Sequence, residues 1–373
     1  MTIVRANGNE APSHIASFDA LRGFAIVFVV YLHAYFSPWE VTPGRDKLNM
    51  HLVHLFAHTA VPMFLFISGY LLAVDRSRSF KVFVSRKVMR IGVPMLFWMT
   101  AALAYRMWDE GGWTGWMHWK DFLLFNISGQ FYYLFVLIVF YVGFFPVRHW
   151  DGRRLARLAA LAFAANLVTI AWYESSSISG DFATLAYRNP LTWVFFVAFG
   201  MAAARRKAGP EWSRRAVALA AAAMGALFAV YLHQGEGRSD YPVSYFGVVV
   251  FLFSCVALVV YPSALAWVFR QSRGAKALAP ATWLGRFAFG IYLVHMPFFI
   301  GFVTEQVVSG SALNDDYAQL MNGIFAVGFG SSLAFVVVVS LLFPRVAALL
   351  LGVEARAPRA AGTVEPARGY VAP

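Results

Sequence analysis

The sequence is dominated by long apolar runs that are separated by short polar segments. A helix that crosses the hydrocarbon core of a bilayer needs about 20 mostly apolar residues, and ten runs have this character. They are centred on residues 18–37, 52–74, 91–107, 130–147, 158–174, 191–204, 216–233, 244–269, 287–308 and 321–343. The sequence therefore predicts an all-α polytopic membrane protein with about ten transmembrane helices.

The overall composition agrees with this class. Hydrophobic residues make up 60% of the 373 residues and charged residues 13%, whereas soluble proteins have roughly 45–50% apolar and 25% charged residues. The single cysteine, Cys255, cannot form an internal disulfide or a cysteine-ligated zinc site. The first apolar run is long enough to span the bilayer and has no small-residue cleavage site, so we expect no cleavable signal peptide.

The basic residues predict the orientation. The formal net charge is +12, and most of the 31 Lys and Arg residues fall in alternate loops, around residues 76–90, 148–157, 205–215 and 270–286. Loops rich in Lys and Arg face the cytoplasm, so both termini are expected on that side. The net charge then reflects topology and does not indicate a nucleic-acid partner.

Three regions follow from this reading. Residues 1–16 form a cytoplasmic N-terminal segment, and residues 17–343 form the transmembrane domain. Residues 344–373 form a cytoplasmic tail that is rich in Ala, Pro and Arg and lacks apolar periodicity. Because such a segment cannot bury a core, we expect it to be disordered.

The first span carries a stripe of ionisable residues. Arg22 and His33 are eleven positions apart, so on a helix they lie within about 20° of one face and about 16 Å apart along the axis. Asp19 lies one turn before Arg22, and we expect the two to pair. An ionisable side chain that faces lipid is costly, so the stripe should face the bundle interior or a wet cavity. Taken alone, His33 is either a hydrogen-bonded structural residue or a catalytic or proton-relay group.

Two further groups allow alternative interpretations. Arg86, Lys87 and Arg90 can present one basic face at a helix start, which suits either anchoring at the membrane surface or phosphate binding. Ser68 and Gly69 remove bulk from the second span, which suits either close helix packing or space for a ligand.

Histidines also occur outside the first span. His51, His54 and His58 share one helix face with a spacing that could bind a metal, but they have no nearby carboxylate. We therefore expect no metal, and His58 is a candidate for the acceptor side of a site. In the ninth span Tyr292 and His295 are one turn apart, which fits structural hydrogen bonding or site lining equally well.

Five motifs occur in a fixed order along the chain. They are Arg22-x10-His33, "VPMFLFISGYLLA" in the second span, "FKVFVSRKVMRIGVPMLFW" leading into the third, "FYYLFVLIVFY" in the fourth and "LGRFAFGIYLVHMPF" in the ninth. With these motifs the chain resembles the integral-membrane acyltransferase family three over residues 15–343. The family acylates sugars of surface polysaccharides, lipopolysaccharide, peptidoglycan and secreted glycans, and some antibiotics. It often has two adjacent arginines where this chain has Arg86 and Lys87.

The resemblance implies a function and a location. An acetyl group, or another short acyl group such as succinyl, would pass from cytoplasmic acyl-CoA to a hydroxyl of an exported glycan or lipid-linked sugar. The protein would lie in the inner membrane of a bacterium. It would act directly or with a partner, which is either a second copy of the chain in a homo-oligomer or an extracytoplasmic protein. A transporter or flippase of lipid-linked sugars is the alternative, but the first span has no counterpart in the second half, as an internal repeat would require.

The expected site residues fall into three groups. The catalytic group is His33, as general base, together with Asp19, which orients Arg22. The acyl-CoA group is Arg22, Ser68, Gly69, Arg86, Lys87 and Arg90. The acceptor group is His58, Tyr133, Tyr292 and His295.

Overall fold

The computed structural model describes residues 13–36, 54–77, 79–112, 116–176, 178, 180–206, 211–235, 245–271, 273–304 and 317–353. Within these ranges every regular element is a helix and no strand occurs. The all-α prediction is therefore confirmed.

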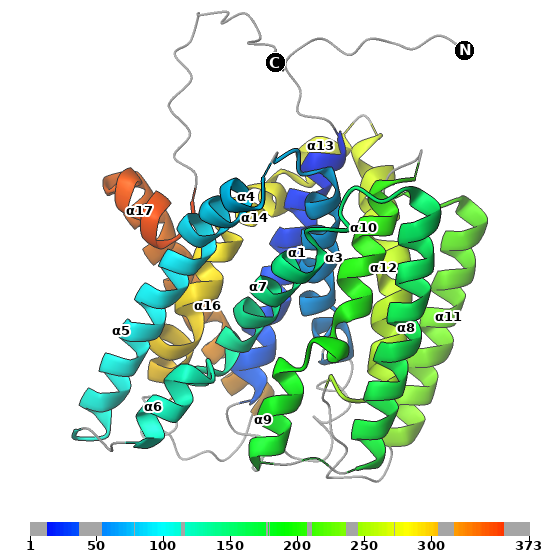
Figure 1. The fold of residues 1–373 in the computed structure, drawn as a ribbon. Coiled ribbons are helices and arrows are strands. Elements are labelled where there is room, and N and C mark those ends of the chain that lie inside the picture. Colours follow the sequence, from blue (N-terminus) through cyan, green and yellow to red (C-terminus); the bar gives the residue numbers. More distant parts are fainter. Residues whose placement is uncertain are drawn as a thin grey trace, which may run out of the picture.

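The long helices follow the predicted apolar runs, and short helices also occur between and after these runs (Figure 1). In chain order they are α1 (Ser13–Phe36), α3 (Ala60–Val74), α4 (Phe80–Lys87), η2 (Val88–Gly92), α5 (Val93–Asp109), α6 (Trp116–Leu123), η3 (Gly129–Phe131), α7 (Tyr132–Phe144), α8 (Gly152–Ser175), α9 (Gly180–Arg188), η4 (Pro190–Thr192), α10 (Val194–Ala204), α11 (Arg214–Gly235), α12 (Val248–Phe269), α13 (Gly274–Ala277), α14 (Ala279–Val294), η5 (His295–Ile300), α16 (Tyr317–Leu342) and α17 (Pro344–Leu350).

Eight helical segments in the described part of the chain are long and apolar enough to cross a membrane. The predicted fourth and sixth spans correspond to shorter apolar helices, Gly129–Phe144 and Val194–Ala204. At 1.5 Å per residue both are shorter than the roughly 30 Å hydrocarbon core. The structure thus shows a polytopic membrane protein with eight full-length candidate spans, and the predicted total of ten is not confirmed.

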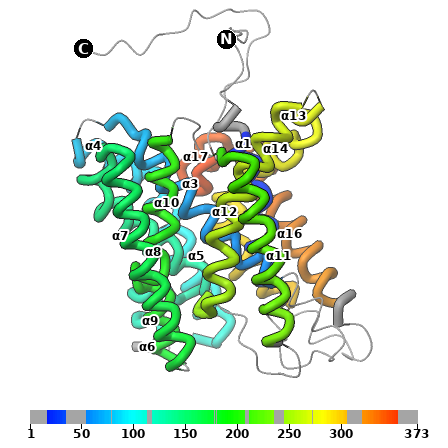
Figure 2. The backbone as a smooth tube through the Cα atoms, turned by 90° about the vertical axis from the view of Figure 1, so that its right-hand side faces the viewer, coloured from blue at the N-terminus to red at the C-terminus, as the bar shows by residue number. Residues whose placement is uncertain are grey.

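Helix α1 lies inside the bundle, where it packs against α3, α12, α14 and α16 (Figure 1). The spans of α3 and α1 are the two most buried of the eight, whereas that of α11 is the least buried. Figure 2 shows α11 at the outside of the bundle beside α12. The helix that carries Arg22 and His33 is therefore surrounded by protein, as the cost of ionisable groups in lipid requires.

Glycines bring α1 and α14 into backbone contact. A Cβ added to Gly285 of α14 would lie 1.8 Å from the carbonyl oxygen of Asp19, and one added to Gly23 of α1 would lie 2.0 Å from that of Ala281. No side chain fits at either position. Small residues allow this close approach between helices in membranes, and it fixes the position of α1 against the helix that continues into η5.

Two wide π-helical turns occur next to prolines. In η5 the turn contains Pro297, and η2 ends directly before α5, which has Pro94 in its first turn. Proline lacks a backbone N–H and its ring clashes with the carbonyl of the preceding turn, so a wider turn relieves both problems locally. Such turns are frequent at functional sites, and these two contain His295 and Arg90.

The predicted cytoplasmic tail, residues 344–373, begins with a helix that was not expected. Helix α17 occupies Pro344–Leu350, the first residues of the segment that was expected to lack fixed structure. Pro344 starts the helix, in which Ala347 is buried, and Leu351 directly after the helix is buried as well. The indole Nε1 of Trp98 in α5 donates to the carbonyl of Leu350 at 2.7 Å. The prediction is therefore wrong up to residue 353, and residues 354–373 lie outside the described residues.

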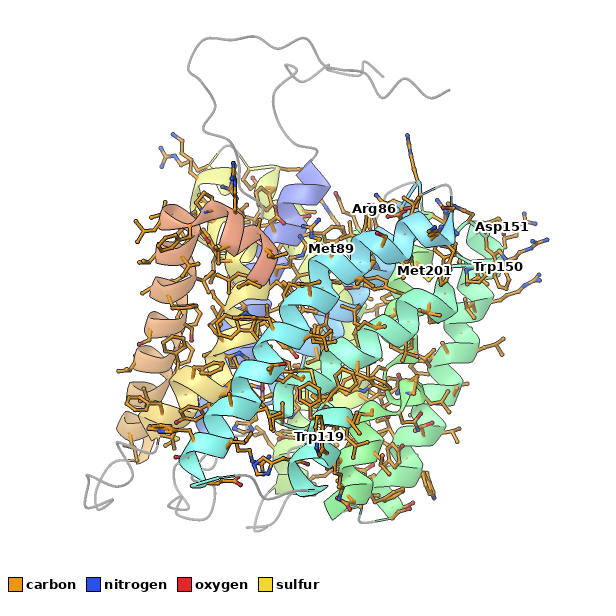
Figure 3. The ribbon with its side chains drawn as sticks, turned by 60° about the vertical axis from the view of Figure 1, so that its left-hand side comes forward. Arg86, Met89, Trp119, Trp150, Asp151 and Met201 are labelled. Atoms are coloured by element: carbon orange, nitrogen blue, oxygen red, sulfur yellow. The ribbon has the colours of Figure 1, made fainter. Side chains whose placement is uncertain are left out.

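The loops that the sequence analysis identified as basic lie at one end of the bundle. Figure 3 shows Arg86, Met89, Trp150 and Asp151 near one end and Trp119 near the other. Helices α4 and α13 lie at the first end and α6 and α9 at the second (Figure 1). The basic loops share one end, which is the arrangement that the charge pattern predicted. That this end faces the cytoplasm stays a prediction, and residues 1–12 lie outside the described residues.

Candidate active site

Four predicted residues meet inside the bundle. The ring centroids of His33 in α1 and His295 at the start of η5 are 5.2 Å apart. The Tyr292 ring is 5.9 Å from that of His295, and the Tyr133 ring of α7 is 5.5 Å from that of Tyr292. Three separate parts of the chain thus build one continuous set of aromatic and imidazole groups.

The tautomer of His295 is set by the helix that precedes it. Its Nδ1 donates to the carbonyl oxygen of Tyr292 at 2.9 Å, and the carbonyl of Ile291 lies 3.2 Å away. A neutral imidazole that donates through Nδ1 keeps a lone pair on Nε2. The His295 side chain is fully buried, and its Nε2 has no hydrogen-bond partner among the described residues. This nitrogen is available to a hydroxyl group that enters the site.

Gln130, which the sequence pattern did not predict as a site residue, lies against Tyr292. The Tyr292 hydroxyl donates to the main-chain carbonyl of Gln130. The side-chain Oε1 of Gln130 accepts from the Ser128 hydroxyl, and its Nε2 is buried without a partner in the described part of the protein. The available signal was a polar residue directly before the "FYYL" motif at the start of an apolar run.

His58 belongs to a neighbouring cluster. Its Nδ1 donates to the carbonyl of His54 at 2.6 Å, and its ring centroid is 4.5 Å from that of Tyr245. His58 also lies close enough to His33 for a direct electrostatic interaction. Tyr245 was not predicted, because it precedes its helix and carries no motif. His51 lies outside the described residues.

Asp19 and Arg22 form the predicted pair. The Nη1 of Arg22 donates to Oδ1 of Asp19 at 2.7 Å, and the two side chains are 29% and 26% exposed. Since α1 is one continuous helix from Ser13 to Phe36, Arg22 and His33 are separated by about 16 Å along its axis. The Tyr133 hydroxyl lies within interaction range of both Ser68 and Arg22. Tyr133 therefore links the Arg22 end of α1 to the aromatic groups beside His295.

Gly69 faces the backbone of a neighbouring helix and not an open space for a ligand. A Cβ at this position would lie 2.1 Å from the carbonyl oxygen of Val197 in α10. Gly200 of α10 makes the reciprocal approach, since its Cβ would lie 2.0 Å from the carbonyl of Phe66. The space beside Gly69 is filled by backbone, so the structure favours close helix packing over the expected acyl-CoA contact.

The three basic residues after the second span do not share one face. Arg86 is exposed and lies 3.5 Å from Oδ1 of Asp75, and Arg90 is exposed in η2. Lys87 instead extends over the Tyr141 ring, with 4.2 Å from Nζ to the ring centroid. A cation above an aromatic face is attracted to the ring, and this contact turns Lys87 toward α7. Lys87 therefore does not share one exposed basic face with Arg86 and Arg90, contrary to the expectation.

Asp75 organises the corner between α3 and α4. Its Oδ1 accepts from the backbone N–H of Ser77 at 2.7 Å and from the Ser77 hydroxyl. Partial burial of the carboxyl favours its neutral form, but these bonds and the charges of Arg86 and Lys87 outweigh burial and lower the pKa of Asp75. Asp75 is thus a carboxylate at neutral pH and holds Arg86 near the end of α3.

The residues that the structure describes contain no group of three His, Cys, Asp or Glu side chains close enough to hold a metal ion. The cluster at His33 and His295 is instead suited to proton transfer, because imidazoles accept and return a proton near neutral pH.

Comparisons with known proteins agree with the motifs. The sequence profile of a family described as an acyltransferase domain, the third of the acyltransferase families, matches residues 15–342. A search of curated proteins found no match, and neither did a search of solved structures.

Proposed function

Because the chain belongs to acyltransferase family three and is a membrane acyltransferase, we propose that it moves an acetyl or other short acyl group from acyl-CoA to a hydroxyl of an exported or cell-surface glycan. The observation that carries the proposal is the pairing of His33 and His295, with ring centroids 5.2 Å apart, inside the bundle. The helix of His33 also carries the Asp19–Arg22 pair at its other end. The basic end would face the cytoplasm of a bacterium, with the protein in the inner membrane.

Acyl transfer to a hydroxyl needs a group that takes the hydroxyl proton and later gives a proton to the departing sulfur. An imidazole nitrogen of His33 takes the proton of the acceptor hydroxyl while the oxygen attacks the thioester carbonyl. The carbon–sulfur bond then breaks, and His33 returns the proton to the departing sulfur, so that CoA leaves as a thiol and the ester remains on the sugar. The Nε2 of His295, which has no partner among the described residues, accepts a hydrogen bond from a second hydroxyl of the incoming sugar and holds the reacting hydroxyl beside His33.

Acyl-CoA would approach from the basic end. Arg86 and Arg90 are exposed there, and cationic donors match the phosphates of CoA. The pantetheine arm would pass Arg22 and reach along α1 toward His33, a distance of about 16 Å. The cytoplasmic donor and the exported acceptor would therefore meet on one helix, and the large nucleotide part of CoA would not cross the membrane.

The test is transfer of labelled acetyl from acetyl-CoA to a purified glycan acceptor by the protein in nanodiscs. His33→Gln keeps the hydrogen-bonding capacity of the side chain but cannot act as an imidazole base, so turnover should fall by roughly 10²–10⁴. Acetyl-CoA binding, measured by calorimetry, should remain.

The matched control is His233→Gln, because His233 lies near the end of α11, the least buried span. This variant should retain wild-type turnover. Near-normal transfer by His33→Gln at saturating acetyl-CoA would remove His33 from the catalytic role and make His295 the next base to test.

A further inference from the structure

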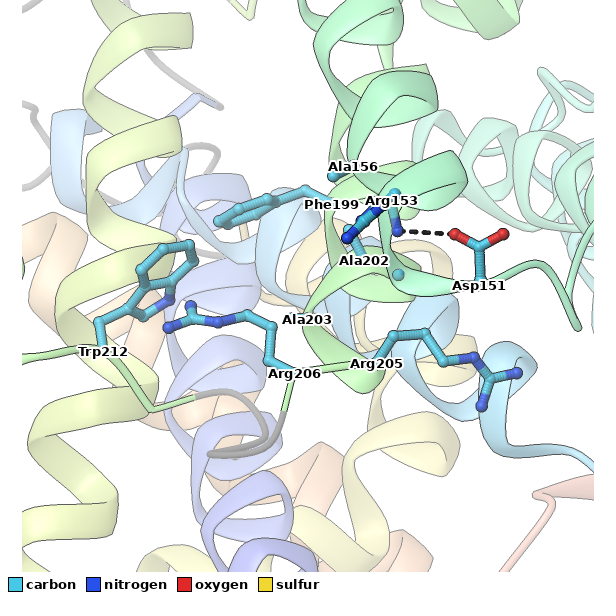
Figure 4. A pocket seen from close by; sticks show the side chains of 10 residues that line it. Asp151, Arg153, Ala156, Phe199, Ala202, Ala203, Arg205, Arg206 and Trp212 are labelled. Carbon is cyan, nitrogen blue, oxygen red and sulfur yellow. Dashed lines mark hydrogen bonds between the residues drawn. The ribbon is translucent and has the colours of Figure 1, made fainter.

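A hollow of about 660 Å³ lies at the basic end of the protein, between the start of α8, the end of α10 and the segment before α11 (Figure 4). Its lining shares no residue with the cluster around His33. Arg153, Arg205 and Arg206 supply its basic groups, and Phe199 and Trp212 supply an aromatic wall. The two aromatic rings are stacked with centroids 5.7 Å apart.

Arg206 lines this hollow without a carboxylate partner among the described residues. Its guanidinium lies over the Trp212 ring, 3.4 Å from the centroid. Its Nη1 is buried and has no hydrogen-bond partner among the described residues, and the same is true of the indole Nε1 of Trp212. Burial lowers the pKa of Arg206 below its ordinary value, because the charged form has lost water without gaining a carboxylate.

The acid that lines the hollow is already engaged. The Oδ1 of Asp151 accepts from the backbone N–H groups of Arg153 at 2.9 Å and Arg154 at 3.0 Å. The Arg154 side chain adds an ion pair at 3.3 Å. Asp151 therefore caps α8 and does not neutralise Arg206.

The neighbouring arginine, Arg205, has hydrogen-bond partners. Arg205 donates through Nη2 to the carbonyls of Ala73 and Arg148, both at 2.9 Å. Figure 4 shows the Arg205 and Arg206 side chains extending in opposite directions. Arg205 ties three segments together, whereas Arg206 presents its donors to the hollow.

The surroundings indicate the depth of the hollow in the membrane. Helices α8 and α11 flank it, and they expose Leu161 (70%) and Leu219 (73%) on their outer surfaces. Lipid tails would cover such side chains, so the hollow at the helix ends lies at the level of the lipid headgroups. Basic pockets between helices at this level recognise anionic headgroups.

We propose that the hollow is a phosphate-binding site in which Arg206 donates to the phosphate oxygens and Trp212 covers the apolar side of the ligand. An anionic phospholipid headgroup and a free phosphorylated solute both carry this group. The backbone N–H of Trp212 donates to Oγ of Ser263 in α12 at 3.1 Å, which anchors the aromatic side of the site to the bundle. This inference does not depend on the identity of the acyl acceptor.

The first experiment measures binding to the detergent-purified full chain. The probes are dioctanoyl phosphatidylglycerol, dioctanoyl phosphatidylcholine with the same tails and no net charge, and inorganic phosphate. Arg206→Gln should weaken phosphatidylglycerol binding about ten-fold or more, as expected for loss of a charged donor. Arg214→Gln removes the same charge from the exposed start of α11, outside the hollow, and should leave binding unchanged. Phosphatidylcholine should bind weakly to all three proteins.

The phosphate arm identifies the source of the ligand. Displacement of phosphatidylglycerol by millimolar inorganic phosphate would show that the hollow takes the free group, and failure of phosphate to compete would assign it to lipid. Both results uphold the proposal if they depend on Arg206. Equal binding by wild type and Arg206→Gln, or equal weakening by the two variants, would overturn it.

A second measurement needs no variant. Phenylglyoxal modifies accessible guanidinium groups, and peptide mass spectrometry reports each site. Phosphatidylglycerol should slow modification of Arg206 in the wild-type protein and leave Arg214 unaffected. If Arg206→Gln does not fold, an unchanged rate at Arg206 with the lipid present would by itself refute the site.

Discussion

The close contact between α1 and α14 makes Gly285→Ala a sharp test of how the site is positioned. The added Cβ would lie 1.8 Å from the carbonyl oxygen of Asp19, whereas ordinary contacts begin at 3.4 Å. The backbones must therefore separate by about 1.6 Å at this point, since the obstructing atom belongs to the backbone and cannot rotate away. Overpacking of this kind costs typically about 1–3 kcal/mol of stability.

The shift has one of two consequences for function, because α1 is a continuous helix. If α1 moves as a rigid body, His33 separates from His295, and a misplacement of about 1 Å lowers turnover on the order of 10²-fold. If α1 pivots about its far end, the Asp19–Arg22 pair moves most, and the acyl-CoA concentration needed for half-maximal rate rises instead. Initial rates over a range of acyl-CoA concentrations in nanodiscs distinguish the two.

The matched control is Gly225→Ala in α11, where an added Cβ meets nothing within 4 Å. Alanine is the better helix former by up to about 1 kcal/mol, so this variant should be at least as stable as wild type and equally active. Wild-type kinetics in Gly285→Ala would refute the prediction, because they would show that the backbone contact does not position the catalytic helix.

Two further predictions concern other parts of the protein. Tyr292→Phe removes the hydroxyl that donates to Gln130 and should lower stability by about 1 kcal/mol in denaturant titrations while reducing turnover in the acetyl-transfer assay. His149 is exposed, but partial desolvation and then two nearby arginines lower its pKa below the ordinary value of 6.5, so the folded chain takes up a proton there less readily than the unfolded chain, and solvent keeps the effect small. Stability should therefore fall as the pH drops below about 6.5, and His149→Gln should show a smaller fall in melting temperature between pH 7 and pH 5; an identical fall in both proteins would contradict the assignment.

Helical periodicity was sufficient to predict the arrangement along α1. The eleven-residue spacing of Arg22 and His33 and the pairing of Asp19 with Arg22 depend only on the geometry of one helix, and the structure shows the ion pair. Apolar runs likewise predicted where the helices lie. The motif resemblance named His295 and Tyr292 as site residues, but it did not show that His295 would lie against His33.

The remaining features depend on contacts between helices, which the sequence pattern does not specify. A glycine such as Gly69 shows only that space is needed beside the helix, and it does not show whether a ligand or another backbone fills that space. In the structure the backbone of Val197 fills it. Lys87 turns away from Arg86 because a ring of α7 attracts it. Gln130 gave no periodic signal, since a single polar residue at the start of an apolar run is ordinary at a membrane surface.

The wide turn η5 also determines where this chain can change in length. A π-helical turn contains more residues per turn than an α-helix, so it is equivalent to an α-helix with one residue inserted. Removing one residue from 296–299 could be absorbed by a return to ordinary helical geometry, with Gly285 still facing α1 and the residues after Ile300 still in phase with α16. Removing one residue from the middle of α14 would instead rotate every later side chain by about 100° and turn His295 away from His33. Tolerance of single-residue deletions along this span should therefore be confined to the few positions that follow the histidine.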